Sequence, residues 1–206
     1  LERLEATTEL KQRAIQSVFD GYISDLGTAQ DYRNIKSNLP ILETYSEDTS
    51  HPKFIAAQEI LDNQLQTHQI TQDFENIILL NTKGNVQYVS NEQYYDLLDK
   101  GLTYGNGKVF KKGKKDFYIT DTYSHGSEDK QSFIATAAPA HDLNGAFIGV
   151  VVFEIETDSA LNVITDVSGY GKTGETLVAK KEGDSGVFLH ELRHDKQGAH
   201  KKVPIN

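Results

Sequence analysis

The sequence contains no cysteine and no methionine among its 206 residues, and its basic residues are in the minority. Without cysteine the chain forms neither a disulfide framework nor a thiol active site, and its redox compartment cannot be inferred. The 30 Asp and Glu residues exceed the 21 Lys and Arg residues, which gives a formal net charge of −9. No basic stripe is present, so we expect no nucleic-acid partner, and an acidic surface disfavours docking on anionic lipid headgroups.

Long hydrophobic runs are also missing. No window approaches the roughly 18 consecutive apolar residues of a membrane span, and no signal peptide is recognisable. The chain begins without Met, in the middle of a helical pattern. We therefore expect it to be part of a longer protein, with any membrane-spanning segments outside it.

The first 27 residues carry the clearest pattern in the chain. Apolar side chains recur there at steps of three and four residues, with polar residues between them and no proline. The pattern predicts one helix over 1–27, about 40 Å long at roughly 1.5 Å per residue. Such a helix could be an ordinary core helix, or a stalk that leaves a membrane and runs along a sensor domain.

Two more helices are expected before residue 70, over part of 28–48 and over 52–69. For the second of these, Ser50 is a plausible N-cap and Pro52 lies in the first turn. The chain then changes character, because short β-branched runs separated by turn residues follow from residue 74. The expected strands are 76–80, 86–89, 116–121, 131–138 and 146–156.

A short helix at 91–99, loops rich in Gly and Lys over 101–115, and a helix at 158–167 complete the first part of the chain. This order predicts an α+β fold, with helices packed on a five-stranded antiparallel sheet. After a Gly-rich linker at 169–174, a new hairpin is expected, with strands 175–181 and 187–192. Because a lone hairpin is not stable by itself, we expect it to open a second domain or to cap the first.

Several segments, taken in order, resemble a Cache domain, the extracellular PAS-like sensor of histidine kinases and chemoreceptors. They are ENIILLNTKGNVQYVS, DFYITDTYS and SFIATAAPAHDLNGAFIGVVVFEIETDSALNVI, and GYGKTGETLVAKKEGDSGVFLHELRH resembles the opening of a second such domain. The resemblance implies a membrane-distal Cache sensor domain over 1–167, and a linker with the opening hairpin of a membrane-proximal Cache domain over 168–206.

The resemblance also implies a function. It indicates a periplasmic or extracellular small-ligand sensor anchored in the cell membrane, in a two-component sensor histidine kinase whose kinase activity lies outside this chain. A chemoreceptor or another receptor is the alternative. No catalytic residue, metal or cofactor is expected in this region, and the helix at 1–27 could mediate a homodimer. A pure dimerisation module without a ligand is a further alternative.

The ligand of Cache domains lies between the curved sheet and the segments over it, so the resemblance implies site residues. The expected ligand-binding residues are Tyr94, Tyr95, Asp121, Tyr123, His125 and Glu154. Among them, Tyr95, Tyr123 and Asp121 are expected to converge, and His125 could make binding dependent on pH. Five of the six have a structural alternative. The three tyrosines could pack in a half-buried sheet, His125 could be exposed in a polar loop, and Glu154 could lie at a solvated strand end.

Two departures from the family's pattern bear on the ligand. The Asp that follows the family's Tyr by two residues is replaced here by His125. The Arg that holds an amino-acid carboxylate in the family would fall at Glu92, and a carboxylate there repels such a ligand. We therefore expect no amino-acid binding by that mode. An amine, a sugar, a cation or no small ligand at all remain open.

The segment from His190 to His194 reads His-Glu-Leu-Arg-His and offers the one enzyme hypothesis, a zinc metalloprotease with Glu191 activating water. His200 falls where the extended motif has a third ligand. That chemistry needs a helix, whereas the preceding residues read as a strand, on which the two histidines would stand roughly 13 Å apart. The Gly of the extended motif is also displaced, to Gly198. We therefore favour a surface loop and predict no metal.

Overall fold

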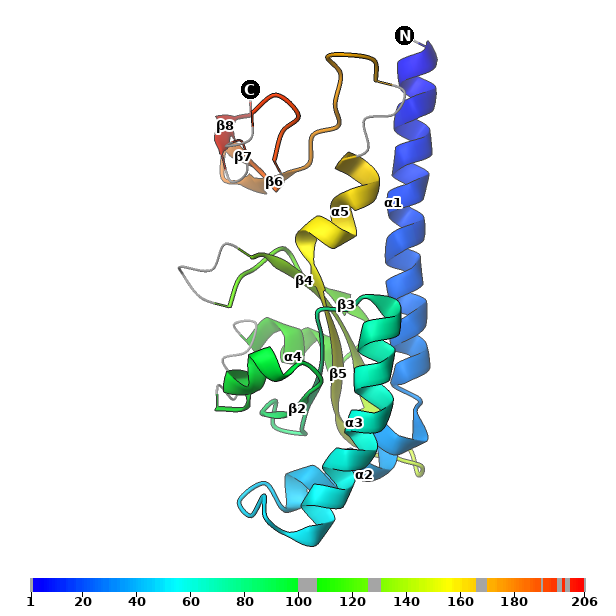
Figure 1. Cartoon of the computed structure of the whole chain (residues 1–206), viewed down its shortest axis with the longest axis vertical. Helices are drawn as coiled ribbons and strands as arrows, with labels where there is room; N and C mark the ends of the chain where they lie inside the picture. Colours follow the sequence, from blue (N-terminus) through cyan, green and yellow to red (C-terminus); the bar gives the residue numbers. More distant parts are fainter. Residues whose placement is uncertain are drawn as a thin grey trace. The chain divides into compact units, whose positions relative to one another are not determined.

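The computed structural model describes residues 2–99, 107–125, 131–165, 170–189, 191–195, 198 and 201–205. By its internal contacts the chain divides into two compact units (Figure 1). One unit is Gly21–Glu156, and the other combines Leu1–Asp20 with Thr157–Asn206. The long helix α1 (Glu2–Ala29) confirms the helix expected over 1–27.

The larger unit contains the five expected strands in one antiparallel sheet. They are β1 (Asn76–Leu80), β2 (Val86–Val89), β3 (Tyr118–Ile119), β4 (Phe133–His141) and β5 (Phe147–Glu156), in the order β2-β1-β5-β4-β3. Every residue of β1 is buried, as are eight consecutive residues of β5. A strand buried on both faces lies between two layers, so the α+β prediction is confirmed, with structure covering both sides of the sheet.

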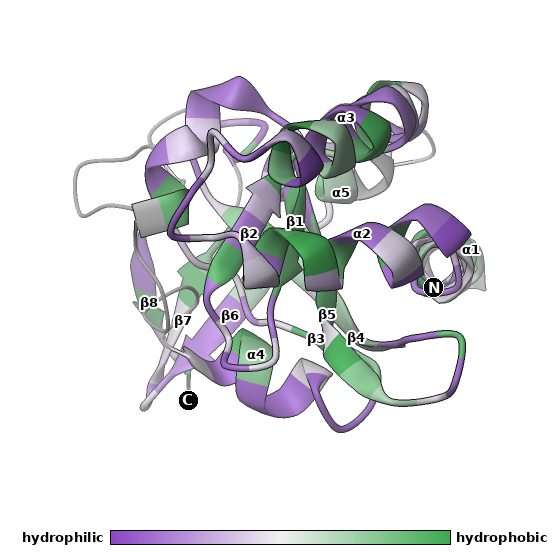
Figure 2. Ribbon diagram, turned by 90° about the horizontal axis from the view of Figure 1, so that it is seen from below, coloured by the Kyte–Doolittle hydropathy of each residue, from purple (hydrophilic) through white to green (hydrophobic). Residues whose placement is uncertain are grey.

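Helices α2 (Arg33–Thr44) and α3 (Pro52–Gln72) contact one side of the sheet. There Phe153 of β5 packs against Phe74, with ring centroids 4.4 Å apart, and against His68 of α3 at 5.6 Å. The N-cap of α3 is His51, whose side chain accepts a hydrogen bond from the Lys53 amide, and not Ser50 as expected. Figure 2 shows that the hydrophobic residues concentrate on the strands between the layers.

The opposite side of the sheet is covered by η1 (Glu92–Asp99), a 3-10 helix, and by α4 (Lys108–Gly113). Figure 1 shows α3 and α4 on either side of the sheet. The prediction of a loop over 101–115 is wrong for α4; residues 100–106 lie outside the described residues. Val109 and Gly113 are buried one turn apart, and a Cβ on Gly113 would come within 2.7 Å of the Ala137 Cβ. These two contacts bring α4 onto β4 although exposed lysines surround them.

The other unit contains α5 (Thr157–Thr165) and a small antiparallel sheet of β6 (Ala179–Glu182), β7 (Ser185–Phe188) and β8 (Lys202–Pro204). The predicted hairpin is confirmed with shorter strands, and the third strand was not expected. In the described part of the His-Glu-Leu-Arg-His segment, Leu192 and Asp195 form a bridge around a turn, so 191–195 is not helical. His190 and His200 lie outside the described residues.

The described residues contain neither a candidate membrane span nor a candidate metal cluster. No helix among them combines the length and the apolar character that a bilayer crossing requires. Within the same ranges, no group of three or more His, Asp or Glu side chains is arranged to hold a metal ion.

Candidate functional site

The candidate site lies at one end of the sheet, where β4 and β5 approach residues that follow β3. Beyond β3, the Thr120 hydroxyl accepts a hydrogen bond from the Ala135 amide at 2.9 Å, which interrupts the regular pairing. Pairing resumes at Tyr123 and Phe133, whose amides and carbonyls exchange hydrogen bonds of 3.0 and 2.7 Å. This extension of the β3–β4 pairing holds Tyr123 beside the end of β5.

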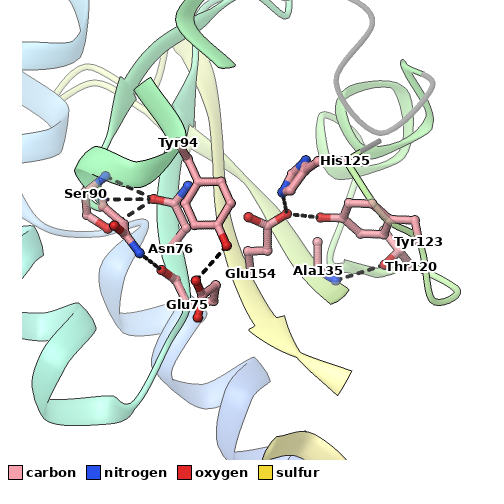
Figure 3. Close-up of polar contacts among 10 residues, drawn as sticks. Glu75, Asn76, Ser90, Tyr94, Thr120, Tyr123, His125, Ala135 and Glu154 are labelled. Carbon is pink, nitrogen blue, oxygen red and sulfur yellow. Dashed lines mark hydrogen bonds and ion pairs between the residues drawn. The ribbon is translucent and has the colours of Figure 1, made fainter. Parts of the chain in front are cut away.

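Glu154, near the end of β5, is the centre of the site. The residue is 0% exposed, although Glu is among the residues least often fully buried. The Tyr123 hydroxyl donates a hydrogen bond of 2.5 Å to Glu154 Oε1, and His125 Nε2 lies 2.9 Å from the same oxygen (Figure 3). The Glu154 carboxylate is therefore an organised buried group and not a solvated strand end.

His125 is also more enclosed than a loop residue would be, with 11% of its side chain exposed. Its ring lies 4.9 Å from that of Phe133 and 5.3 Å from that of Tyr94, between centroids. Tyr123 stands nearly perpendicular to it, at 5.9 Å. The Tyr94, Tyr123 and Phe133 rings thus lie around His125, next to the carboxylate, and the faces of Tyr and Phe rings attract cations.

Tyr94 of η1 adds a second carboxylate to the site, because its hydroxyl donates a hydrogen bond of 2.7 Å to Glu75 Oε1. Burial, followed by this hydrogen bond and the charges of nearby carboxylates, raises the pKa of the Tyr94 hydroxyl. The carboxylates concerned are Glu75, Glu154 and Glu156. The Tyr94 side chain therefore remains a neutral donor in a region of negative potential.

Asn76 of β1 belongs to the same site and was not among the residues expected from the sequence. It pairs directly with Glu154 across β1 and β5, so the two side chains share one face of the sheet. Asn76 is 0% exposed, and its side chain is linked to Ser90 after β2. An Asn at the first position of a strand forms no recognisable motif, so no sequence signal marked it.

The structure brings four of the six predicted residues together and leaves two apart. Tyr94, Tyr123, His125 and Glu154 form the cluster. Tyr95 is 41% exposed and lines a separate groove with Tyr88 beside β2, and Asp121 is exposed. The expected convergence of Tyr95 and Asp121 with Tyr123 is therefore not seen, because neighbouring residues of η1 face different ways and Asp121 points to solvent.

The fold is that of Cache-type ligand-binding sensor domains, at low sequence identity. The ligand-binding domain of the Pseudomonas aeruginosa amino acid chemoreceptor PctC, in complex with GABA, aligns with a TM-score of 0.57 and 18% identity, over 97% of this chain and 78% of that one. The ligand-binding domain of the Pseudomonas fluorescens chemoreceptor CtaA, in complex with L-serine, aligns with a TM-score of 0.55 and 16% identity, over 97% and 74%.

The sensor domain of the V. cholerae histidine kinase DctB also aligns, with a TM-score of 0.52 and 17% identity, over 88% of this chain and 66% of that one. For several of the matching solved structures, DctB among them, the chain spans only 63% to 66% of their length. A comparison with curated protein sequences gave no match. Residues 6–141, more than half of the chain, match the family described as "Protein of unknown function (DUF1157)", and the protein belongs to that family.

Proposed function

We propose that this chain is the extracytoplasmic small-ligand sensing region of a transmembrane signalling receptor, and that Glu154 is the centre of its ligand site. The observation that carries the proposal is the fully buried Glu154 carboxylate, held by Tyr123 and His125 on the face of the sheet that η1 and α4 cover. Burying a carboxylate costs free energy. A ligand site gives a physical reason for placing the charge there, and convergent polar groups among apolar side chains are typical of such sites.

The chemistry of the site favours a cationic amine as the ligand. Three carboxylates raise the pKa of Tyr94, and neither Lys nor Arg contributes to that shift. Aromatic rings around the carboxylate add cation–π attraction, which is largest for a desolvated cation. L-serine and GABA, named with the CtaA and PctC domains, each carry an amine. Glu92 is exposed at the start of η1, where the family resemblance would place a carboxylate-binding Arg.

The proposal extends to the organisation of the chain. Residues 1–167 form the membrane-distal sensor domain, and residues 168–206 form a linker with the opening of a membrane-proximal domain. The structural neighbours include chemoreceptors and a histidine kinase. The proposal is therefore a transmembrane signalling receptor, without a choice between these two kinds of output. A ligand that binds one receptor conformation better than another shifts the population towards it. Self-association of the receptor through α1 would carry the shift between subunits.

The test is ligand-dependent thermal stabilisation of the chain by a panel of small amines, with sugars and carboxylic acids as comparison compounds. At a ligand concentration 100 times the Kd, binding stabilises the folded state by about 2.7 kcal/mol, and each kcal/mol raises Tm by roughly 2–4 °C at this chain length. We expect at least one amine to give a shift of this size and the comparison compounds to give none.

Two variants assign the shift to the proposed site. Glu154→Gln keeps an acceptor for Tyr123 and removes the charge, so we expect the amine-dependent shift to be lost. Asp121→Asn removes the charge of an exposed predicted residue, and the shift should be retained. The proposal is wrong if no amine stabilises the chain, or if Glu154→Gln responds as the unmodified protein does.

A further inference from the structure

The Asn76 side chain contains a buried donor that the fold itself does not use. The Asn76 amide nitrogen, Nδ2, is inaccessible to solvent and makes no hydrogen bond to any residue that the structure describes. Buried polar atoms are nearly always hydrogen-bonded, because an unpaired one loses its hydrogen bonds to water and gains none in the protein. An unpaired donor beside a proposed ligand site therefore needs an explanation.

The orientation of the Asn76 amide is fixed by its other end. Asn76 Oδ1 accepts hydrogen bonds from the backbone amides of Ser90 and Asn91, at 3.1 and 3.2 Å. The Ser90 hydroxyl also donates to this oxygen at 3.3 Å, and accepts in turn from the Ile77 amide at 2.8 Å. Exchanging the amide oxygen and nitrogen would place an NH2 group against two backbone N–H groups. The geometry therefore assigns the nitrogen to the opposite side, towards Tyr94 and Glu154 (Figure 3).

The position of Asn76 relative to Glu154 follows from the register of the sheet. The two residues are direct partners across β1 and β5, and such partners have Cβ atoms about 5 Å apart. A donor on β1 and a carboxylate on β5 consequently face the same small volume. The pair is complementary to a molecule that presents a positive nitrogen to Glu154 and an oxygen acceptor to Asn76.

We infer that Asn76 Nδ2 is a second ligand contact, and that the ligand is an amine with a hydroxyl, carbonyl or carboxylate oxygen roughly two to three bonds from its nitrogen. This inference rests on the proposed function and narrows it, because it distinguishes oxygen-bearing amines from simple alkylamines. Asn76 selects the oxygen and Glu154 selects the cation. The structural link to Ser90 uses only Oδ1, so the two roles of Asn76 can be separated.

The experiment measures the Kd of ethanolamine and of propylamine by isothermal titration calorimetry on the full chain. The two probes have the same number of non-hydrogen atoms and differ by an oxygen in place of a methyl group. A neutral hydrogen bond in a buried site is expected to favour ethanolamine by about three- to tenfold. The ratio of the two Kd values is the readout, because a general loss of folding or of negative charge changes both probes together.

Three variants complete the design. Asn76→Val removes the amide nitrogen and leaves no polar side-chain atom to meet the hydroxyl of ethanolamine, so the preference for ethanolamine should fall to about one. The accompanying loss of the Oδ1 link to Ser90 should change the binding of both probes together. Asn76→Ala also removes the amide nitrogen, with a smaller side chain, and provides the measurement if the Val variant does not fold. Thr136→Val is the matched control. Thr136 Oγ1 is also buried without a hydrogen bond to a described residue. Its neighbours on β4, Ala135 and Ala137, face the site, so Thr136 lies on the opposite face of the sheet. It should keep the full preference.

The outcomes separate this inference from the function on which it rests. Equal binding of both amines by the unmodified chain, or a preference that survives both Asn76 variants, would overturn the role of Asn76 and leave Glu154 as an amine site. Binding of neither probe, together with no thermal response to any amine, would overturn the amine site itself.

Discussion

Replacing Tyr123 with Phe tests whether the buried Glu154 carboxylate is stabilised as the structure indicates. The change removes one hydroxyl and leaves the ring, which packs against Phe133 and His125. The lost hydrogen bond is 2.5 Å long and ends on a carboxylate with no exposed surface. Hydrogen bonds to charged groups contribute about 1.5–3 kcal/mol, and a buried acceptor is not compensated by water. We expect the free energy of unfolding to fall by that amount.

The assay is urea unfolding at pH 7 followed by circular dichroism, because the chain lacks tryptophan for fluorescence. Tyr95→Phe is the matched control: it removes the same atom from an exposed tyrosine of η1 and should change stability by less than about 0.5 kcal/mol. In a Glu154→Gln background the acceptor is neutral, so Tyr123→Phe should cost only about 0.5–1.5 kcal/mol. Equal losses for the two tyrosine variants, or the same cost in both backgrounds, would refute a charged acceptor at Glu154.

Two further predictions concern the packing of α3 against the sheet and a glycine within β5. Burial lowers the pKa of His68 below its ordinary value of 6.5, so the unfolded chain takes up this proton more readily, and stability should be lost as the pH falls below that value. His68→Phe keeps a ring against Phe153, and its free energy of unfolding should fall less between pH 7 and pH 5 than that of the unmodified chain. An equal fall in both proteins would mean that another group causes the acid sensitivity. Gly149 has φ of +152°, and a Cβ there would lie 2.0 Å from the Leu80 carbonyl oxygen. Gly149→Ala should therefore lose at least about 2 kcal/mol in urea unfolding, while Gly145→Ala, with open space around it, should lose less.

The sheet was predictable because its strands combine two strong signals. Continuous β-branched and apolar runs mark β1 and β5 as buried on both faces, and the Asn144-Gly145 turn fixes the β4–β5 hairpin. Helix α4 was not predictable in the same way. Only Val109 and Gly113 of its six residues are buried, and the Lys residues between them are exposed. A segment of Lys and Gly with one buried apolar residue has the composition of a loop. Its helical state depends on the contact with β4, which no local pattern records.

The family resemblance named Tyr94, Tyr123, His125 and Glu154, whereas the strand period by itself accounts only for the burial of Glu154. Glu154 lies in an apolar strand with its side chain on the same face as Val150 and Val152, so its burial follows from the strand period of two. Tyr95 and Asp121 were misplaced because an aromatic pair in a short 3-10 helix cannot present both rings to one side, and an irregular segment after β3 has no reliable phase. The family resemblance named His125 but not Asn76, and the positions of both side chains depend on contacts made far along the chain, which spacing does not reveal.

The register of β1 against β5 connects the stability of the site with the selectivity proposed for it. Asn76 and Glu154 meet because the two strands pair at their ends, and the network from Ser90 and Asn91 holds Asn76 without using its nitrogen. A one-residue slip of β1 against β5 would turn Asn76 to the face of the sheet that α2 and α3 cover and leave Glu154 on the other face. The fold therefore retains a buried charge and a buried donor that do not satisfy each other, at some cost in stability. Such a cost is consistent with a site selected for binding, since a packed apolar pair at these positions would stabilise the sheet and leave nothing to recognise an amine.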